Sequence, residues 1–371
     1  MDIRIMHINS ERTWRGGENQ MRLLINGLWE KGITSFLVAP SNSYIAQKAR
    51  DFKAQKIFLE NMRGEINILL AFKLAKIVDE YKINILHAHT SHAHTLAFLV
   101  KLIARYKPKI VVTRRVDFYP YRGKNLLNIL NRIKYIKGAD HYIAISNKIK
   151  QILIECGIPE NKITVVYSGV DPERVSGGNG KLFFLKTYKK SDEIIIGNIS
   201  YFADHKAHED LIKATKIVKE NGYNVKLFLA GYGEREKFLK KLVKEIGLEK
   251  DVIFLGFVEN VKDLLAFFDL FVVSSREEGL CSSIIDAFFA GCPVVATDAG
   301  GIPELVKNGE TGVLVCRGDP FSLANGIMWA LENPHLMKEM AERAKEFAYE
   351  RFTAEKMLEG NLEVYKRLLF S

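Results

Sequence analysis

Residues 274–305 read SSREEGLCSSIIDAFFAGCPVVATDAGGIPEL, and this segment decides the fold. The apolar, β-branched run before it, residues 269–273, predicts a strand. Ser282 begins a helical stretch that ends at Gly291, and residues 293–296 predict a second strand. The segment is therefore a strand, loop, helix and strand unit. Its loop lies at the carboxyl end of a parallel strand, where open α/β sheets bind ligands.

Two acidic side chains stand in this unit, Glu278 in the loop and Asp286 in the helix, separated by seven residues. One carboxylate accepts two hydrogen bonds at once, so it suits the neighbouring hydroxyls of a ribose or a hexose. The free amides at the start of the helix, residues 281–283, favour a phosphate. These residue types in this order predict a site for a sugar nucleotide.

Strands and helices alternate through the whole chain, which predicts parallel sheets of the α/β class. A length of 371 residues predicts two domains, and the turn-rich stretch 171–179 is the expected linker. We expect similar doubly wound domains at residues 1–175 and 180–353. The predicted strands are residues 3–9, 36–40, 83–89, 109–113, 141–146 and 162–167 in the first half, and 193–200, 225–231, 252–257, 270–275 and 293–298 in the second.

The composition is that of a soluble globular protein, with 47% hydrophobic and 26% charged residues. The sequence contains no apolar run of about 18 residues, which a membrane-spanning helix needs. Its amino-terminal residues predict a strand and lack the apolar core of a signal peptide, so we expect a cytoplasmic location. The four cysteines follow no metal-binding or disulfide spacing and are expected to be reduced.

Positive charge is concentrated in the first half of the chain. Residues 1–180 hold 28 lysines and arginines against 15 aspartates and glutamates, a balance of +13, whereas residues 181–371 hold 26 against 29, a balance of −3. A basic surface attracts phosphate-rich acceptors or the anionic cytoplasmic leaflet, and it also occurs simply as a solvated face. No nucleic-acid-binding motif accompanies the charge, so nucleic acid is not an expected partner.

Three further loops contain residues that could take part in substrate binding or catalysis. Gly16 and Gly17 follow the first strand and precede a helix expected to begin near Glu18, so the backbone can approach an anion closely. Lys206, after the first strand of the second domain, can stabilise a diphosphate leaving group. Arg115 follows the strand at 109–113 and can hold a carboxylate or phosphate with its planar fork.

Histidines cluster in HAHTSHAHT, at positions 87, 89, 92 and 94. The first two belong to a strand end and the last two to the next helix, and the sequence has no DxD motif that would hold a diphosphate through a divalent metal. We therefore expect no metal and no cofactor in the site, and we expect His89 or His92 to face an acceptor.

At this level the sequence resembles the nucleotide-sugar glycosyltransferases of glycosyltransferase family 4, which have the GT-B fold of two Rossmann-like domains facing a central cleft. Their pattern is Glu, seven residues, Glu, then Ala-x-Ala-x-Gly-x-Pro-Val-Val-Ala-Thr and Gly-Gly-x-Pro-Glu. This chain has Glu278, then DAFFAGCPVVAT at 286–297 and GGIPE at 300–304, with Asp286 in place of the second Glu. Smaller matches are AIS at 144–146, SGVD at 168–171 and LAGYGE at 229–234.

The resemblance implies a retaining, metal-independent hexosyltransferase that uses a nucleoside-diphosphate sugar. With the residues described above, we expect Glu278, Lys206, Arg115 and Asp117 to be catalytic, and His89, His92 and Arg115 to contact a glycan or glycolipid acceptor such as lipopolysaccharide core. It also implies that the final helix, within residues 354–371, packs back on the first domain. The residues implied to bind the donor are Gly16, Gly17, Asn198, Lys206, Glu278, Gly279, Leu280, Cys281, Ser282 and Asp286.

Besides Asp286, two departures from the family pattern are Asn198, where an arginine is usual, and Arg115, where many members have a catalytic histidine. Arginine is not a general base at neutral pH, so proton transfer is left to Asp117 or to another group. Two other interpretations are a nucleotide-sugar epimerase of the same architecture and a non-catalytic sugar-binding protein.

Overall fold

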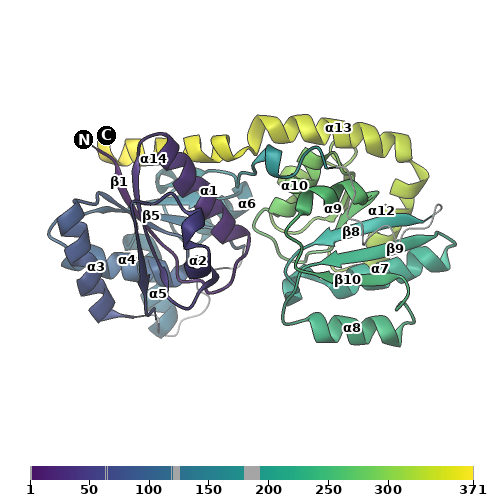
Figure 1. The fold of residues 1–371 in the computed structure, drawn as a ribbon, viewed down its shortest axis with the longest axis horizontal. Helices are drawn as coiled ribbons and strands as arrows, with labels where there is room; N and C mark the ends of the chain where they lie inside the picture. The colour runs from purple at the N-terminus through teal and green to yellow at the C-terminus, as the bar shows by residue number, and fades with distance from the viewer. Residues whose placement is uncertain are drawn as a thin grey trace. The chain divides into compact units, whose positions relative to one another are not determined.

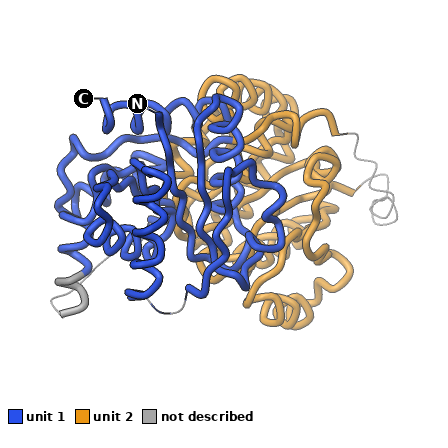
Figure 2. Tube along the Cα trace, turned by 60° about the vertical axis from the view of Figure 1, so that its left-hand side comes forward, with its two compact units in different colours: residues 1–169, 354–371 blue, residues 170–353 orange. Residues whose placement is uncertain are grey.

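A computed structural model of the chain describes residues 2–62, 64, 66–117, 119, 126–178 and 193–370. It consists of two compact units, drawn in different colours in Figure 2. Unit 1 comprises residues 1–169 and 354–371, and unit 2 comprises residues 170–353. Each unit is an α/β domain built on one parallel sheet, which confirms the fold class expected from the sequence.

The sheet of unit 1 has the strand order β3-β2-β1-β4-β5-β6-β7. Chain order reverses between β1 and β4, so the loops after these two strands leave the sheet side by side. Five of the strands have fully or almost fully buried residues, as a sheet covered on both faces requires. The strands are β1 (Arg4–Ile8), β2 (Thr34–Pro40), β3 (Lys56–Glu60), β4 (Ile85–Ala88), β5 (Lys109–Arg114), β6 (His141–Ala144) and β7 (Ile163–Val165).

The last helix of the chain, α14 (Ala354–Phe370), belongs to the core of unit 1. It lies beside α1 (Gly16–Glu30), where Leu358 packs so closely that a Cβ on Gly27 would stand 2.7 Å from its Cδ2 atom. Tyr365 is fully buried in the same hydrophobic cluster as Ile5 and Ile85 of the sheet. The other helices of unit 1 are α2 (Tyr44–Gln47), η1 (Ala49–Asp51), α3 (Ile68–Tyr81), α4 (Ser91–Ile103), α5 (Leu126–Lys137), α6 (Asn147–Glu155) and η2 (Glu160–Lys162).

Unit 2 repeats this plan with the strand order β10-β9-β8-β11-β12-β13. Its centre leaves no room for a side chain at Gly197 in β8, because a Cβ there would stand 2.0 Å from the ring of Phe268. The strands are β8 (Ile194–Ile199), β9 (Val225–Ala230), β10 (Val252–Gly256), β11 (Leu270–Val273), β12 (Val294–Thr297) and β13 (Val313–Val315). The helices are η3 (Pro172–Arg174), η4 (Asp204–Lys206), α7 (His208–Glu220), α8 (Glu236–Glu245), α9 (Val261–Phe267), α10 (Ser282–Ala290), α11 (Ile302–Leu305), α12 (Pro320–Glu332) and α13 (Pro334–Arg351).

The structure differs from the sequence-based expectation at the boundary between the units. The chain divides between Gly169 and Val170, before the limit expected at residue 175. The described part of the expected linker packs on unit 2, because Arg174 pairs with Asp286 and a Cβ on Gly178 would overlap the backbone of Lys262. Two strands were also missed, β3 and β13, while α1 begins at Gly16 rather than near Glu18.

Candidate active site

The donor residues predicted from the sequence come from two neighbouring loops of unit 2. These loops follow β8 and β11, which pair in parallel at the point where chain order reverses. Two hydrogen bonds fasten one loop to the other. The amide of Arg276 donates to the carbonyl of His205 at 2.8 Å, and the Ser274 hydroxyl donates to the carbonyl of Lys206 at 2.9 Å. The geometry of both loops is therefore set by the sheet.

At this junction Lys206 and Glu278 form an ion pair. The Nζ atom of Lys206 donates to Oε2 of Glu278, and the Ser275 hydroxyl donates to the same oxygen at 3.2 Å. The side chains of Lys206 and Glu278 are only 17% and 13% exposed. The amide of Gly301 donates to the Glu278 carbonyl at 2.9 Å, which also fixes the backbone. Lys206 and Glu278 are 72 positions apart in the chain, and each was predicted to contact the donor. The structure brings them into contact at a partly desolvated site.

Asp286, the predicted ribose ligand, has a partner that sequence reasoning missed. Nη2 of Arg174 in η3 donates to its Oδ1 at 2.5 Å. The carboxylate is almost buried, and this burial raises its pKa, while the charge and hydrogen bond of Arg174 act in the opposite direction. No local pattern links residues that are 112 positions apart. The guanidinium extends the polar surface beyond the Asp286 carboxylate, which is one methylene shorter than the family's glutamate.

The backbone is strained at two points beside these residues. Ala207 and Cys281 have positive φ angles of 49° and 74°, a conformation that costs a non-glycine residue about 1–3 kcal/mol. Ala207 directly follows Lys206, and Cys281 directly precedes helix α10. Leu280 and Cys281 are buried, and burial raises the pKa of the Cys281 thiol to about 11, so the thiol is neutral at pH 7. Gly279 and Ser282 flank this strained turn on either side.

Asn198 lies on β8 and is buried. Its amide donates to the carbonyl of Val272 at 2.8 Å and its side-chain oxygen accepts from the Ser200 hydroxyl at 2.7 Å. Asn198 therefore ties β8 to β11. The prediction that it contacts the donor stays a prediction, and its bonds in the structure are those of a residue that supports the loops.

In unit 1, Gly17 and Arg115 are placed against each other. A Cβ on Gly17 would stand 3.3 Å from Cδ of Arg115, so the glycine allows the arginine to lie over the first turn of α1, which begins at Gly16. Burial lowers the pKa of Arg115 to about 10, and the Glu18 carboxylate opposes this shift. The side chain remains a cation at pH 7. Its Nε atom is buried and has no hydrogen-bond partner. Asp117 is half-buried two residues further along.

The two histidines predicted to face an acceptor lie in different surroundings. His92, in the first turn of α4, is exposed and lines a small hollow with Ser10 and Asn67. His89 is buried, and its Nε2 atom lies 3.1 Å from Nδ1 of His7. Sequence reasoning missed His7, which lies on β1, far from the HAHTSHAHT segment in the chain.

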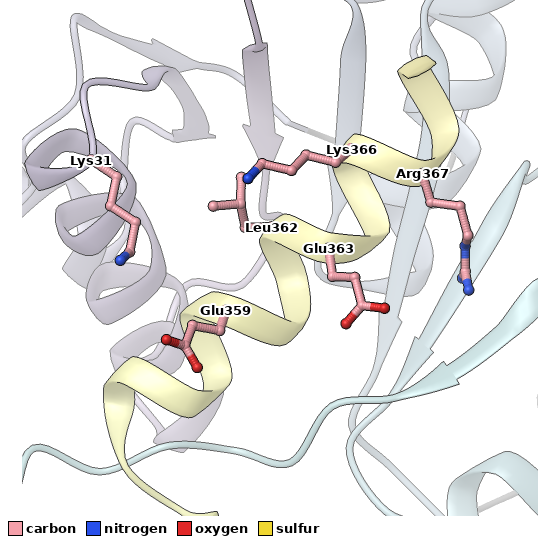
Figure 3. Close-up of a pocket in the computed structure, with 6 residues that line it drawn as sticks. All are labelled: Lys31, Glu359, Leu362, Glu363, Lys366 and Arg367. Atoms are coloured by element: carbon pink, nitrogen blue, oxygen red, sulfur yellow. The ribbon is translucent and has the colours of Figure 1, made fainter. Parts of the chain in front are cut away.

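A larger hollow on α14 is lined by Lys31, Glu359, Leu362, Glu363, Lys366 and Arg367, none of which was predicted to bind a substrate (Figure 3).

Comparisons with known proteins agree with this arrangement. Residues 182–366 match the family model described as glycosyl transferases group 1, and residues 14–174 match the model described as Glycosyltransferase Family 4. Together with these matches, two units that are each built on one parallel sheet identify a glycosyltransferase of the GT-B type. The chain belongs to glycosyltransferase family 4, so the resemblance identified in the sequence is confirmed.

One similar protein is N-acetyl-alpha-D-glucosaminyl L-malate synthase of Bacillus anthracis, which is 33% identical over 82% of this chain and 80% of its own length. The lipopolysaccharide core biosynthesis glycosyltransferase LpsE of Rhizobium meliloti is 25% identical over 94% and 95%. Among solved structures, Anabaena HepE in complex with UDP-glucose has a TM-score of 0.86 at 20% identity, over 98% of this chain and 100% of that one. None of the helices described in the structure has the length and apolar character needed to cross a membrane.

Proposed function

We propose that this chain is a retaining glycosyltransferase that moves a hexose-type sugar from a nucleoside-diphosphate sugar to an acceptor hydroxyl, in the synthesis of lipopolysaccharide or another cell-envelope glycan. The observation that carries the proposal is the Lys206–Glu278 ion pair at the carboxyl ends of β8 and β11. The retaining outcome is supported by family membership. The names of LpsE and of the Staphylococcus aureus capsular polysaccharide glycosyltransferase CapM support a role in envelope glycans.

The ion pair suits the chemistry of sugar transfer. When the bond between the sugar and the diphosphate breaks, negative charge builds on the leaving phosphate, and a fixed ammonium group such as Lys206 stabilises it. A bound diphosphate competes with Glu278 for this ammonium group. Once released, the carboxylate of Glu278 has two oxygens that can accept hydrogen bonds from sugar hydroxyls. Lys206 therefore stabilises the leaving group, and Glu278 binds the sugar.

The nucleotide part of the donor is assigned to the start of α10. Helix amides near Ser282 favour a phosphate, and the Asp286 carboxylate, held by Arg174, is suited to ribose hydroxyls. The HepE complex with UDP-glucose supports a nucleotide-sugar donor. We assign the diphosphate to protein groups alone, with no metal bridging it and no further cofactor.

The acceptor is assigned to unit 1. Arg115 has a planar fork for a carboxylate or phosphate, and His89 and His92 lie on the neighbouring strand end and helix start. The L-malate in the name of the Bacillus anthracis relative is a dicarboxylate, which agrees with an anionic acceptor. Asp117 is the residue we assign to accept the proton of the acceptor hydroxyl. The basic first half of the chain further suggests a cytoplasmic protein that contacts the anionic face of the membrane.

Substitution of the ion pair tests this function. Lys206→Ala and Glu278→Ala should each abolish sugar transfer without unfolding the protein, whereas Lys216→Ala, on an exposed ion pair of α7, should leave transfer unchanged. Wild-type protein is incubated with UDP, GDP and ADP sugars and candidate acceptors, and NMR of the product gives its anomeric configuration. Unchanged turnover in either variant would remove that residue from its role, and an inverted product would refute the retaining assignment.

Incubation of the protein with the donor alone separates the other interpretations. An epimerase would change the donor sugar without an acceptor. A non-catalytic sugar-binding protein would bind a nucleotide sugar and give no product with any acceptor. Either outcome would refute the proposed transfer reaction.

A further inference from the structure

Three buried histidines of unit 1 gather at the carboxyl ends of two paired strands. His7 on β1 and His87 on β4 stand opposite each other in the parallel ladder. His89 follows two positions after His87, and residues two apart in a strand share a face. One ring nitrogen from each of the three histidines lies within 4.8 Å of the other two, and all three side chains are buried. The topology of the sheet thus brings the three imidazoles together.

We propose that His7, His87 and His89 of unit 1 form a binding site for one divalent transition-metal ion of the zinc type. The Nδ1 atom of His7 and the Nε2 atom of His89 are 3.1 Å apart. Two imidazole nitrogens that ligate one zinc ion, each at about 2.0–2.1 Å in a tetrahedral arrangement, are separated by roughly 3.3 Å. The cluster is therefore already spaced for a shared ion.

Two ring nitrogens of the cluster face away from the shared position. The other ring nitrogens of this pair, Nε2 of His7 and Nδ1 of His89, are buried and have no hydrogen-bond partner. An ion between Nδ1 of His7 and Nε2 of His89 would not contact these two nitrogens, so the support for an ion is the spacing and burial of the three imidazoles.

His87 has the supporting contacts of a metal ligand. Its Nδ1 atom lies 2.6 Å from the Tyr365 hydroxyl and its Nε2 atom lies 2.7 Å from the Thr113 hydroxyl. In protein metal sites the second ring nitrogen of a ligating histidine usually bonds to a neighbouring polar group, which fixes the ring. One of the two hydroxyls would keep this role while the other ring nitrogen takes the ion. Three protein ligands leave a fourth tetrahedral position for water or a substrate oxygen.

One nearby charge opposes the ion. Burial lowers the pKa of His87 and His89, and the Arg115 cation acts in the same direction, so Arg115 also disfavours a metal cation there. The Glu18 carboxylate interacts favourably with Arg115 and reduces this repulsion. Without an ion, the same three imidazoles would form a neutral polar cluster. Metal binding by the purified chain distinguishes these two states, and it does so whether or not the proposed transfer reaction is correct.

The experiment uses the full chain expressed without a histidine tag and freed of metal by chelation. Zn²⁺ or Co²⁺ is added, the bound metal is counted by elemental analysis, and the visible spectrum of Co²⁺ reports ligation. We expect one ion per chain. His7→Asn and His89→Asn should each weaken binding by about 100-fold or more. His94→Asn is the matched control, because His94 is a fully buried histidine of unit 1 that lies outside the cluster.

Wild-type protein that binds neither ion would overturn the proposal, even if a variant fails to fold. Equal affinity in wild type, His7→Asn and His89→Asn would place the ion elsewhere and would also overturn it. Circular dichroism of each variant shows whether the fold is kept. A rise in the melting temperature with Zn²⁺ in wild type and His94→Asn, but not in folded His7→Asn, would support the site.

Discussion

Replacement of Arg174 by alanine should destabilise unit 2, because it leaves the Asp286 carboxylate without its cation. Breaking a fully buried ion pair by removing one partner costs about 3–5 kcal/mol, whereas exposed pairs contribute about 0–1 kcal/mol. The side chain of Arg174 is 33% exposed and that of Asp286 is 12% exposed, so the pair lies between these limits. We expect a loss of about 2 kcal/mol in the free energy of unfolding, within the range that these two classes define.

The loss should depend on pH in a defined direction. Burial raises the pKa of Asp286 in the folded state, so the folded protein holds this proton more tightly than the unfolded chain does. A carboxyl group of this kind destabilises the fold progressively as the pH rises, first through its pKa in the unfolded chain and then through its pKa in the folded protein. Arg174 opposes that effect. The loss in the free energy of unfolding caused by Arg174→Ala should therefore be small near pH 4 and should grow towards pH 7.

Thermal unfolding of unit 2 measures the effect. For a domain the size of residues 170–353, a change of 1 kcal/mol moves the melting temperature by about 2–4 °C, so the variant should melt about 4–8 °C below wild type at pH 7. Asp286→Asn and the double variant complete a double-mutant cycle, whose coupling energy should be about 2 kcal/mol. A coupling energy below about 0.5 kcal/mol, or a deficit that stays constant between pH 4 and pH 7, would refute this reasoning.

Other changes test single features of the backbone and core. Lys82→Gly should raise the free energy of unfolding by about 0.5–1 kcal/mol, since the exposed Lys82 ends α3 with a φ of 50°; a lower melting temperature would contradict this. Gly197→Ala should lower it by about 1–3 kcal/mol, because the new methyl overlaps Phe268, and denaturant unfolding would show it. Gly17→Val should displace Arg115 and reduce transfer activity with little loss of stability; unchanged activity would contradict the close placement of the two residues.

The local parts of the fold could be predicted from the sequence because local patterns specify them. The run LFVV, a serine at a helix start and the Gly291-Cys292-Pro293 ending predict β11, α10 and β12, and the structure has these elements within one or two residues. The strands β3 and β13 were missed for a physical reason. Both lie at the edges of their sheets and are only partly buried, so their apolar pattern is weak.

The parts of the site that depend on distant contacts could not be predicted. Glu278 and Lys206 were found because family motifs mark them, but nothing in their own segments shows that they pair. Arg174 was interpreted as part of a linker, since turn residues around it conceal a contact that only tertiary packing creates. His7 is a single histidine in an apolar strand, and its association with His89 depends on the pairing of β1 with β4.

The place of α14 in unit 1 has a consequence for synthesis of the protein. The core of unit 1 includes Leu358 and Tyr365, which are translated after all of unit 2, although the sheet they pack on is translated before it. Residues 170–353 contain all of unit 2 and can fold as soon as they emerge. The sheet of unit 1 is therefore translated before unit 2, but its core is completed only after α14 has been translated, and until then the face that α14 covers stays open.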